Sequence, residues 1–213
     1  PPLPPPPPLP SVPPLPPLPR HPPIFVVGDS HALAPGWRVV HWRAEARLLR
    51  PVSVTGLKAW HLRPGSDFYT SASFDATVLR LPRGATLIAV IGQIDCREGL
   101  LPAVERARYE SVEEAVETVV GIYVARLTEL ASARAFDVMV HPVPPALDET
   151  RTLAKLFNAT LRRAVQAAPS LHWLDFFDQL LSPDGEALAD GLALDGTHLH
   201  PSYVSLLEAA LPQ

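Results

Sequence analysis

Ile24-Phe25-Val26-Val27-Gly28-Asp29-Ser30 opens with four consecutive apolar residues and ends on a serine that follows a Gly-Asp pair. An uninterrupted apolar run is typical of a strand that is buried on both faces of a parallel sheet. Further apolar runs lie at residues 52–55, 86–91, 136–140 and 171–174, and helical patterns separate most of them. This alternation predicts the α/β class, with three layers, α/β/α, around a five-stranded parallel sheet.

The clearest helical pattern begins at Ser111, where Ser111-Val112-Glu113-Glu114 has the form of a capping box. Apolar residues then recur at spacings of three and four as far as Leu130, which is the pattern of an amphipathic helix. Further helices are expected at about residues 150–167 and 202–211, with weaker patterns at about 31–35 and 68–81.

Polar and glycine-rich segments follow the first three predicted strands. Ser30 comes after the first strand, Gly56 after the second, and the segment Gly92 to Arg97 after the third. Because ligands of open α/β sheets bind at the carboxyl ends of the strands, we expect these three segments to form one site at a single edge of the sheet.

Asp195-Gly196-Thr197-His198, near the end of the sequence, could complete a catalytic site with Ser30. A serine hydroxyl is a weak nucleophile at neutral pH, so it needs a histidine to take its proton and a carboxylate to orient that histidine. Ser30, His198 and Asp195 are therefore the expected catalytic residues. His200 is a competing imidazole, but the spacing from Asp195 favours His198.

These segments resemble the sequence blocks of the SGNH/GDSL hydrolases. That family has Gly-Asp-Ser after the first strand, a glycine after the second, Gly-x-Asn-Asp after the third and Asp-x-x-His near the end. The resemblance spans roughly residues 24–211 and implies the flavodoxin-like fold of the family. It also implies that Ser30 is the nucleophile, His198 the base and Asp195 its partner, and that Gly56 is the glycine of the second block.

The third block departs from the family pattern. Gly92-Gln93-Ile94-Asp95 has Ile94 where the family has its oxyanion-hole asparagine. Loss of one such side-chain donor typically lowers turnover by about 10²–10³-fold. The backbone N–H groups of Ser30 and Gly56 remain as expected donors, and the amide of Gln93 is a candidate third donor. Both an atypical active hydrolase and an inactive relative fit this pattern.

Several side chains near these blocks are candidates for substrate contact: His31, Lys58, Arg97 and His141. Each also has a structural alternative. His31 could pack at the start of the first helix, and Arg97 could either stabilise an oxyanion or pair with Asp95. Trp60, close to the second block, is the tryptophan best placed to act as a platform for carbohydrate.

Residues 1–23 are almost entirely proline and leucine, a composition that favours an extended polyproline II segment. This segment could link the domain to another part of a protein or bind a partner with an aromatic-lined groove. Residues 24–213, about 190 residues, are long enough for one domain with a sizeable core and are predicted to be the SGNH hydrolase-like domain.

The composition narrows the functional classes further. A net charge of −4 with scattered basic residues argues against a nucleic-acid or anionic-membrane partner. No run of about 20 apolar residues predicts a transmembrane helix. No phosphate loop, dinucleotide fingerprint or cysteine–histidine cluster is present, so no cofactor or metal is expected. A single cysteine excludes an internal disulfide and leaves both extracellular and cytoplasmic locations open.

The expected function is hydrolysis of a carboxylic ester through an acyl-enzyme, with an O-acetyl group on carbohydrate as the leading substrate. Two alternatives remain open at this stage. One is transfer of an acyl group to a sugar hydroxyl by the same residues. The other is a non-catalytic glycan-binding or structural module on the same fold.

Overall fold

The computed structural model describes residues 21–213. The proline-rich segment predicted for residues 1–23 therefore lies outside the described residues except for its last three. The described chain has the predicted α/β class. Its sheet contains β1 (Pro23–Gly28), β2 (Val39–Trp42), β3 (Glu45–Ser53), β4 (Thr86–Val90), β5 (Asp137–Val140) and β6 (Leu171–Trp173).

The strand order is β2-β3-β1-β4-β5-β6, and all neighbouring pairs are parallel except β2 with β3. The prediction of five strands is therefore wrong by one strand. The additional strand, β2, forms a hairpin with β3 and covers the outer edge of the sheet. Arg43 and Ala44 make the connecting turn with φ values of 50° and 61°, the left-handed pair required by a type I′ hairpin turn.

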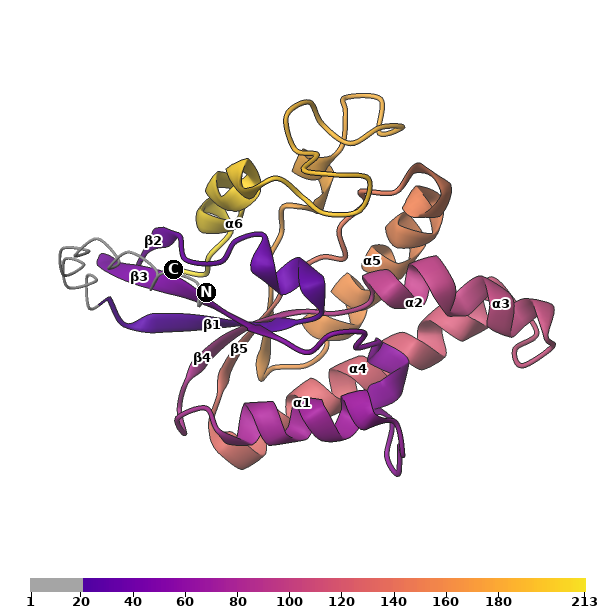
Figure 1. Cartoon of the computed structure of the whole chain (residues 1–213), viewed down its shortest axis with the longest axis horizontal. Coiled ribbons are helices and arrows are strands. Elements are labelled where there is room, and N and C mark those ends of the chain that lie inside the picture. Colours follow the sequence, from indigo (N-terminus) through magenta and orange to yellow (C-terminus); the bar gives the residue numbers. More distant parts are fainter. Residues whose placement is uncertain (1–20) are drawn as a thin grey trace, which may run out of the picture.

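Helices cover both faces of the sheet, as predicted (Figure 1). One layer contains α1 (Tyr69–Leu79), α2 (Gln93–Glu98), α3 (Leu100–Glu105), α4 (Val112–Arg134) and α5 (Arg151–Gln166). On the opposite face lie the 3₁₀ helix η1 (Ser30–Leu33) and α6 (Val204–Ala209). The remaining 3₁₀ helices are η2 (Ala59–Leu62), η3 (Asp148–Thr150), η4 (Phe177–Leu180) and η5 (Pro201–Tyr203).

Strand β1 shows why a continuous apolar sequence was required. Phe25 and Val27 pack into the core beneath α1, α4 and α5, whereas Ile24 and Val26 pack into a second core beneath α6. Successive side chains of a strand point to opposite faces, so a strand between two helical layers needs apolar residues at every position. The strand ends at the carboxyl edge of the sheet, directly before Ser30.

No helix among the described residues is long and apolar enough to span a membrane.

Candidate active site

Ser30 follows β1 immediately after a sharp turn. At Gly28 a Cβ atom would lie 2.0 Å from the Val90 carbonyl oxygen, so only glycine allows this close approach of two strands. Asp29 follows the strand as the N-cap of η1, and its Oδ1 accepts a hydrogen bond from the His31 N–H at 2.9 Å. This cap starts η1 at Ser30 and holds the serine at the carboxyl edge of the sheet.

The structure brings Ser30, His198 and Asp195 together. Ser30 Oγ lies 2.9 Å from His198 Nε2, and His198 Nδ1 lies 2.9 Å from Asp195 Oδ2. Asp195 Oδ1 also accepts the backbone N–H groups of Thr197 and His198, both at 2.7 Å. The carboxylate therefore fixes the loop and the imidazole at the same time.

The loop that carries His198 is anchored on both sides of the imidazole. The Leu194 N–H donates to the His198 carbonyl at 3.0 Å, and the His200 N–H donates to the Leu192 carbonyl at 2.8 Å. Leu199 is only 1% exposed and packs into the core under α6. His200 is used differently, because its Nδ1 accepts the Ser202 N–H at 3.2 Å and caps η5.

The charges at these three residues suit a general base. Hydrogen bonds, chiefly from His198, lower the pKa of Asp195 to about 2, so this side chain is a carboxylate at neutral pH. The His31 ring lies 4.8 Å from the His198 ring, centroid to centroid. Burial, and then the nearby charge of His198, lower the pKa of His31 to about 3. His31 is therefore neutral and packs against the base without adding a second charge.

The third block forms the start of α2. Gly92 precedes the helix with φ 125°, and a Cβ there would lie 2.8 Å from Val143 and 2.9 Å from Phe157. Gln93, the first helical residue, lies beside His31 and is 2% exposed. The Gln93 amide interacts with the His31 ring and partly offsets the lowering of the His31 pKa, but neither polar atom of the amide meets the geometry of a hydrogen bond within residues 21–213. A buried amide with so few hydrogen bonds is unfavourable in the free protein.

Asp95 connects the third block to the second. It is 1% exposed, and its carboxylate accepts the N–H groups of Ala59 at 2.7 Å and Trp60 at 3.1 Å. Burial raises the pKa of Asp95 to about 6. Arg97 does not pair with this carboxylate; its guanidinium lies 2.6 Å from Glu98 at the surface. The predicted alternative of an Arg97–Asp95 pair is thus replaced by a pair between adjacent residues.

Gly56 lies in the turn between β3 and η2 with φ 74°, a conformation that favours glycine. Within the described chain, neither the Gly56 N–H nor the Ser30 N–H donates a hydrogen bond. Both groups therefore remain free for a ligand.

Comparisons with known proteins bear on this arrangement. No protein-family model and no curated protein sequence matches the chain. Several solved structures are similar to the chain. A protein from Streptococcus pneumoniae assigned as a platelet activating factor gives a TM-score of 0.60 at 16% identity, over 89% of this chain and 82% of that chain. The lipase Lip_vut3 from a goat rumen metagenome gives 0.55 at 14% identity, over 89% and 95%. A protein from Slackia heliotrinireducens assigned as an SGNH hydrolase gives 0.50 at 16% identity, over 89% and 96%.

The chain has the SGNH hydrolase fold. Identities of 14–16% establish the fold alone, so the chemistry must be argued from the side chains. Within residues 21–213, no group of three or more histidine, cysteine, aspartate or glutamate side chains is placed to hold a metal ion.

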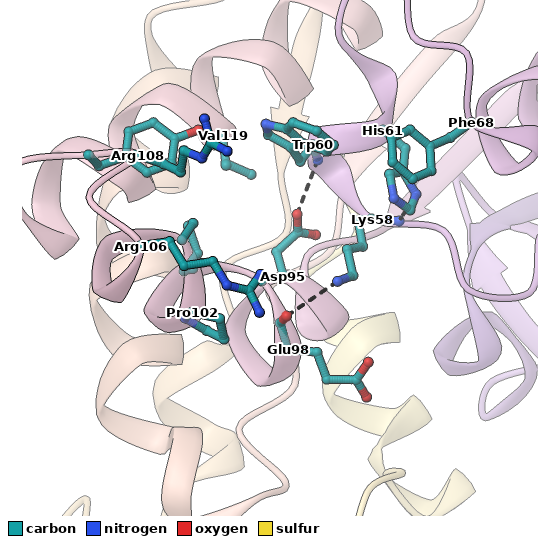
Figure 2. A pocket seen from close by; sticks show the side chains of 14 residues that line it. Lys58, Trp60, His61, Phe68, Asp95, Glu98, Pro102, Arg106, Arg108 and Val119 are labelled. Carbon is teal, nitrogen blue, oxygen red and sulfur yellow. Dashed lines mark hydrogen bonds between the residues drawn. The ribbon is translucent and has the colours of Figure 1, made fainter.

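The remaining candidates of the SGNH-fold domain have different surroundings. Lys58 lines a cavity of about 680 Å³ between η2 and the α2–α3 segment (Figure 2). His141 is 1% exposed and lies in the core, where Nδ1–H donates to the Pro142 carbonyl at 2.6 Å and Nε2 accepts from the Tyr203 hydroxyl, 3.1 Å away. Because both ring nitrogens are hydrogen-bonded inside the core, His141 has a structural role and does not line the cavity that contains Lys58.

Two functional candidates were missed by sequence reasoning. Arg106 and Arg108 line the same cavity as Lys58, at the end of α3. No clear sequence pattern marks them, since α2 and α3 are each six residues long and a helical periodicity is not detectable over so few residues.

Proposed function

We propose that this protein is a serine hydrolase that cleaves carboxylic esters through an acyl-enzyme. The observation that carries the proposal is the chain of two contacts, each 2.9 Å long, from Asp195 through His198 to Ser30 Oγ. Both are short enough for proton transfer and for orientation of the imidazole in the absence of substrate.

In the first half-reaction, Ser30 Oγ bonds to the ester carbonyl carbon while His198 Nε2 accepts the hydroxyl proton. The resulting tetrahedral intermediate collapses, the bond to the alcohol oxygen breaks, and His198 returns the proton to that oxygen. In the second half-reaction, water attacks the acyl carbon and gives a proton to His198. The acyl–Oγ bond then breaks, the proton returns to Ser30 and the carboxylic acid leaves. Asp195 stabilises the imidazolium in both halves.

The oxyanion of each intermediate needs donors that are in place before the reaction. The proposed donors are the free N–H groups of Ser30 and Gly56 and the side-chain amide of Gln93. Gln93 is favoured over Arg97 for the third donor. Its amide is buried without a partner, whereas the Arg97 guanidinium is engaged with Glu98 at the surface.

Hydrolysis is favoured over transfer to a sugar hydroxyl because the site is open. The side chains of His198 and Asp195 are 28% and 53% exposed, so water can reach the acyl-enzyme. Among esters, an O-acetyl group on carbohydrate is the proposed substrate, and Trp60 on the cavity wall is a suitable platform for a sugar. A non-catalytic module would not need the aligned Asp195–His198–Ser30 contacts.

The proposal is tested by steady-state hydrolysis of 4-nitrophenyl acetate with four proteins. Ser30→Ala and His198→Ala should each lower kcat by at least about 10³-fold, because each removes a group needed for covalent catalysis. His200→Ala is the matched control, since His200 lies two residues from the base but caps η5. Equal rates for the wild type and Ser30→Ala would refute the proposal.

A further inference from the structure

A cavity of about 680 Å³ lies between segments that carry two of the proposed oxyanion donors, and its lining includes none of Ser30, His198 and Asp195. Its walls come from η2, from the α2–α3 segment and from the turn after α3 (Figure 2). Asp95 is part of this wall and also of α2, the helix that begins with Gln93. Lys58 on the opposite wall is two residues beyond Gly56. The cavity wall is therefore continuous in sequence with the segments of two of the three proposed oxyanion donors, Gln93 and Gly56.

Three cationic side chains line the cavity. Two of them, Arg106 and Arg108, make no hydrogen bond or ion pair through their side chains within residues 21–213. The third, Lys58, reaches only the backbone carbonyl of Glu98, at 3.4 Å between Nζ and the oxygen (Figure 2). All three charges are thus available to a ligand.

The acidic side chains in the wall offset these three cations only in part, because Asp95 supplies one negative charge near Lys58. Both carboxylate oxygens of Asp95 accept backbone N–H groups, and the carboxylate of Glu98 is paired with Arg97. His61 adds no charge of either sign at neutral pH, because burial lowers its pKa to about 4. The cavity consequently has an excess of positive charge.

The backbone after α3 holds both arginines at the cavity. The Ala107 N–H donates to the Val104 carbonyl at 2.8 Å, and the Arg108 N–H donates to the Ala103 carbonyl at 3.0 Å. These two bonds form a Schellman motif, whose turning residue is usually glycine. Here it is Ala107 with φ 52°. The tight turn fixes the backbone on both sides of Ala107, so Arg106 and Arg108 both line the cavity.

The rest of the wall is mainly apolar and aromatic, and two neighbours hold the Trp60 ring. The guanidinium of Arg63 lies 3.4 Å from the Trp60 ring centroid, and Phe68 meets the ring edge-on at 5.6 Å. A rigid aromatic ring suits the flat apolar face of a sugar or an aryl group. Arginine suits a carboxylate or sulfate, because its planar donors match two acceptor oxygens.

We infer that this cavity binds an organic anion, and that the ester attacked by Ser30 carries a carboxylate or sulfate beside a flat apolar face. Arg106, Arg108 and Lys58 would hold the anionic group while Trp60 packs against the apolar face. That the anion is part of a substrate rests on the proposed function. Binding of an anion in the cavity does not depend on catalysis.

Isothermal titration calorimetry with two non-ester ligands tests the site. These are 4-nitrophenyl β-glucuronide and 4-nitrophenyl β-glucoside, which differ by a carboxylate. The wild type should bind the glucuronide at least about tenfold more tightly, and this preference should weaken as salt rises from about 0.05 M to 0.5 M. The double variant Arg106→Gln/Arg108→Gln should lose it. Arg80→Gln, an exposed arginine at the end of α1, is the matched control and should keep it.

Release of acetate from the tri-O-acetyl forms of 4-nitrophenyl glucuronide and 4-nitrophenyl xyloside tests the substrate role. The xyloside lacks only the carboxylate. We expect kcat/KM to favour the glucuronide through KM, and the double variant to lose that preference. Equal affinity for the two non-ester ligands, or no effect of the double substitution, would overturn the anion site even if both esters are cleaved. Binding of the glucuronide without hydrolysis of either ester would instead refute the proposed function, and with it the anion's place in a substrate.

Discussion

The substitution Gln93→Leu separates what the buried amide of Gln93 does for catalysis from what it does for stability. Gln93 is 2% exposed and lies beside His31, but neither amide atom meets hydrogen-bond geometry in the described chain. Each buried unpaired polar group destabilises a fold by about 1–3 kcal/mol. Leucine fills a similar volume without those groups. The substitution should therefore raise the free energy of unfolding by at least about 1 kcal/mol, which corresponds to about 2–4 °C in Tm for a domain of this size.

The effect on catalysis should have the opposite sign. If the Gln93 amide donates to the oxyanion, its loss should lower kcat by about 10²–10³-fold, or roughly 3–4 kcal/mol of barrier. KM should change little, because the interaction is made only in the transition state. Thermal unfolding and hydrolysis of 4-nitrophenyl acetate measure the two effects in the same preparation.

Asn158 provides a matched control, because it is a buried amide whose polar atoms are both bonded. Its Oδ1 accepts the Val143 N–H at 2.7 Å, and its Nδ2–H donates to the Val143 carbonyl at 2.9 Å. Asn158→Leu should therefore destabilise the fold by at least about 2 kcal/mol, since it also leaves two buried backbone groups unpaired. If Gln93→Leu instead lowers Tm and leaves kcat intact, Gln93 is a structural residue and the reasoning is refuted.

Gly92, His141 and Ile94 each allow a separate test. Gly92→Ala should destabilise the fold by about 3 kcal/mol or more in denaturant unfolding, because the new Cβ clashes with two core side chains at a φ of 125°. Gly121→Ala is the control: no atom lies near the new Cβ in α4, so this substitution should stabilise the fold by about 0.5–1 kcal/mol. Equal effects of the two substitutions would contradict the predicted clash at Gly92. Burial lowers the pKa of His141 to about 4, so the folded state binds fewer protons than the unfolded state between about pH 4 and 6.5. The free energy of unfolding therefore falls by about 3 kcal/mol as the pH is lowered from about 6.5 to 4, because protonation of His141 favours the unfolded state. The difference in unfolding free energy between the wild type and His141→Gln should shift by that amount between pH 7 and pH 4, and a constant difference would count against it. Finally, Ile94→Asn should change kcat by less than about threefold, because Gln93 already supplies the amide; a tenfold rise would show that the third donor is missing.

The sequence could predict the elements whose burial dictates their composition. Strands β1, β4 and β5 have helices on both faces, so their residues are apolar throughout and the pattern is readable. The positions of Ser30 and of the second and third blocks then followed from a topological rule, since parallel strands end at the same edge.

The hairpin of β2 and β3 could not be predicted, because its turn and one of its strands lack the residues that usually mark a hairpin in sequence. Arg43 and Ala44 adopt left-handed φ values without the Asn-Gly pair that announces such a turn. Pro51 in β3 argues against a strand in sequence. In the structure, β2 pairs with β3 only as far as Leu48, so Pro51 faces no partner on that side.

The side-chain environment of the site was equally hidden. Nothing in the sequence distinguishes Gln93, which is buried without a partner, from an exposed glutamine at the start of a helix. Likewise, only the turn at Ala107 brings Arg106 and Arg108 to one cavity. Such contacts depend on the tertiary placement of short helices, which local pattern does not determine.

Reaction with a fluorophosphonate, followed by peptide mass spectrometry, tests the central claim most directly. A fluorophosphonate phosphonylates a serine that an adjacent base has activated, with loss of fluoride, so the reaction reports on Ser30 and His198 together. We expect one adduct, on Ser30, which is absent from Ser30→Ala and which forms much more slowly in His198→Ala. An unmodified protein, or an adduct on another residue, would contradict the assignment of Ser30 as the nucleophile of an active hydrolase.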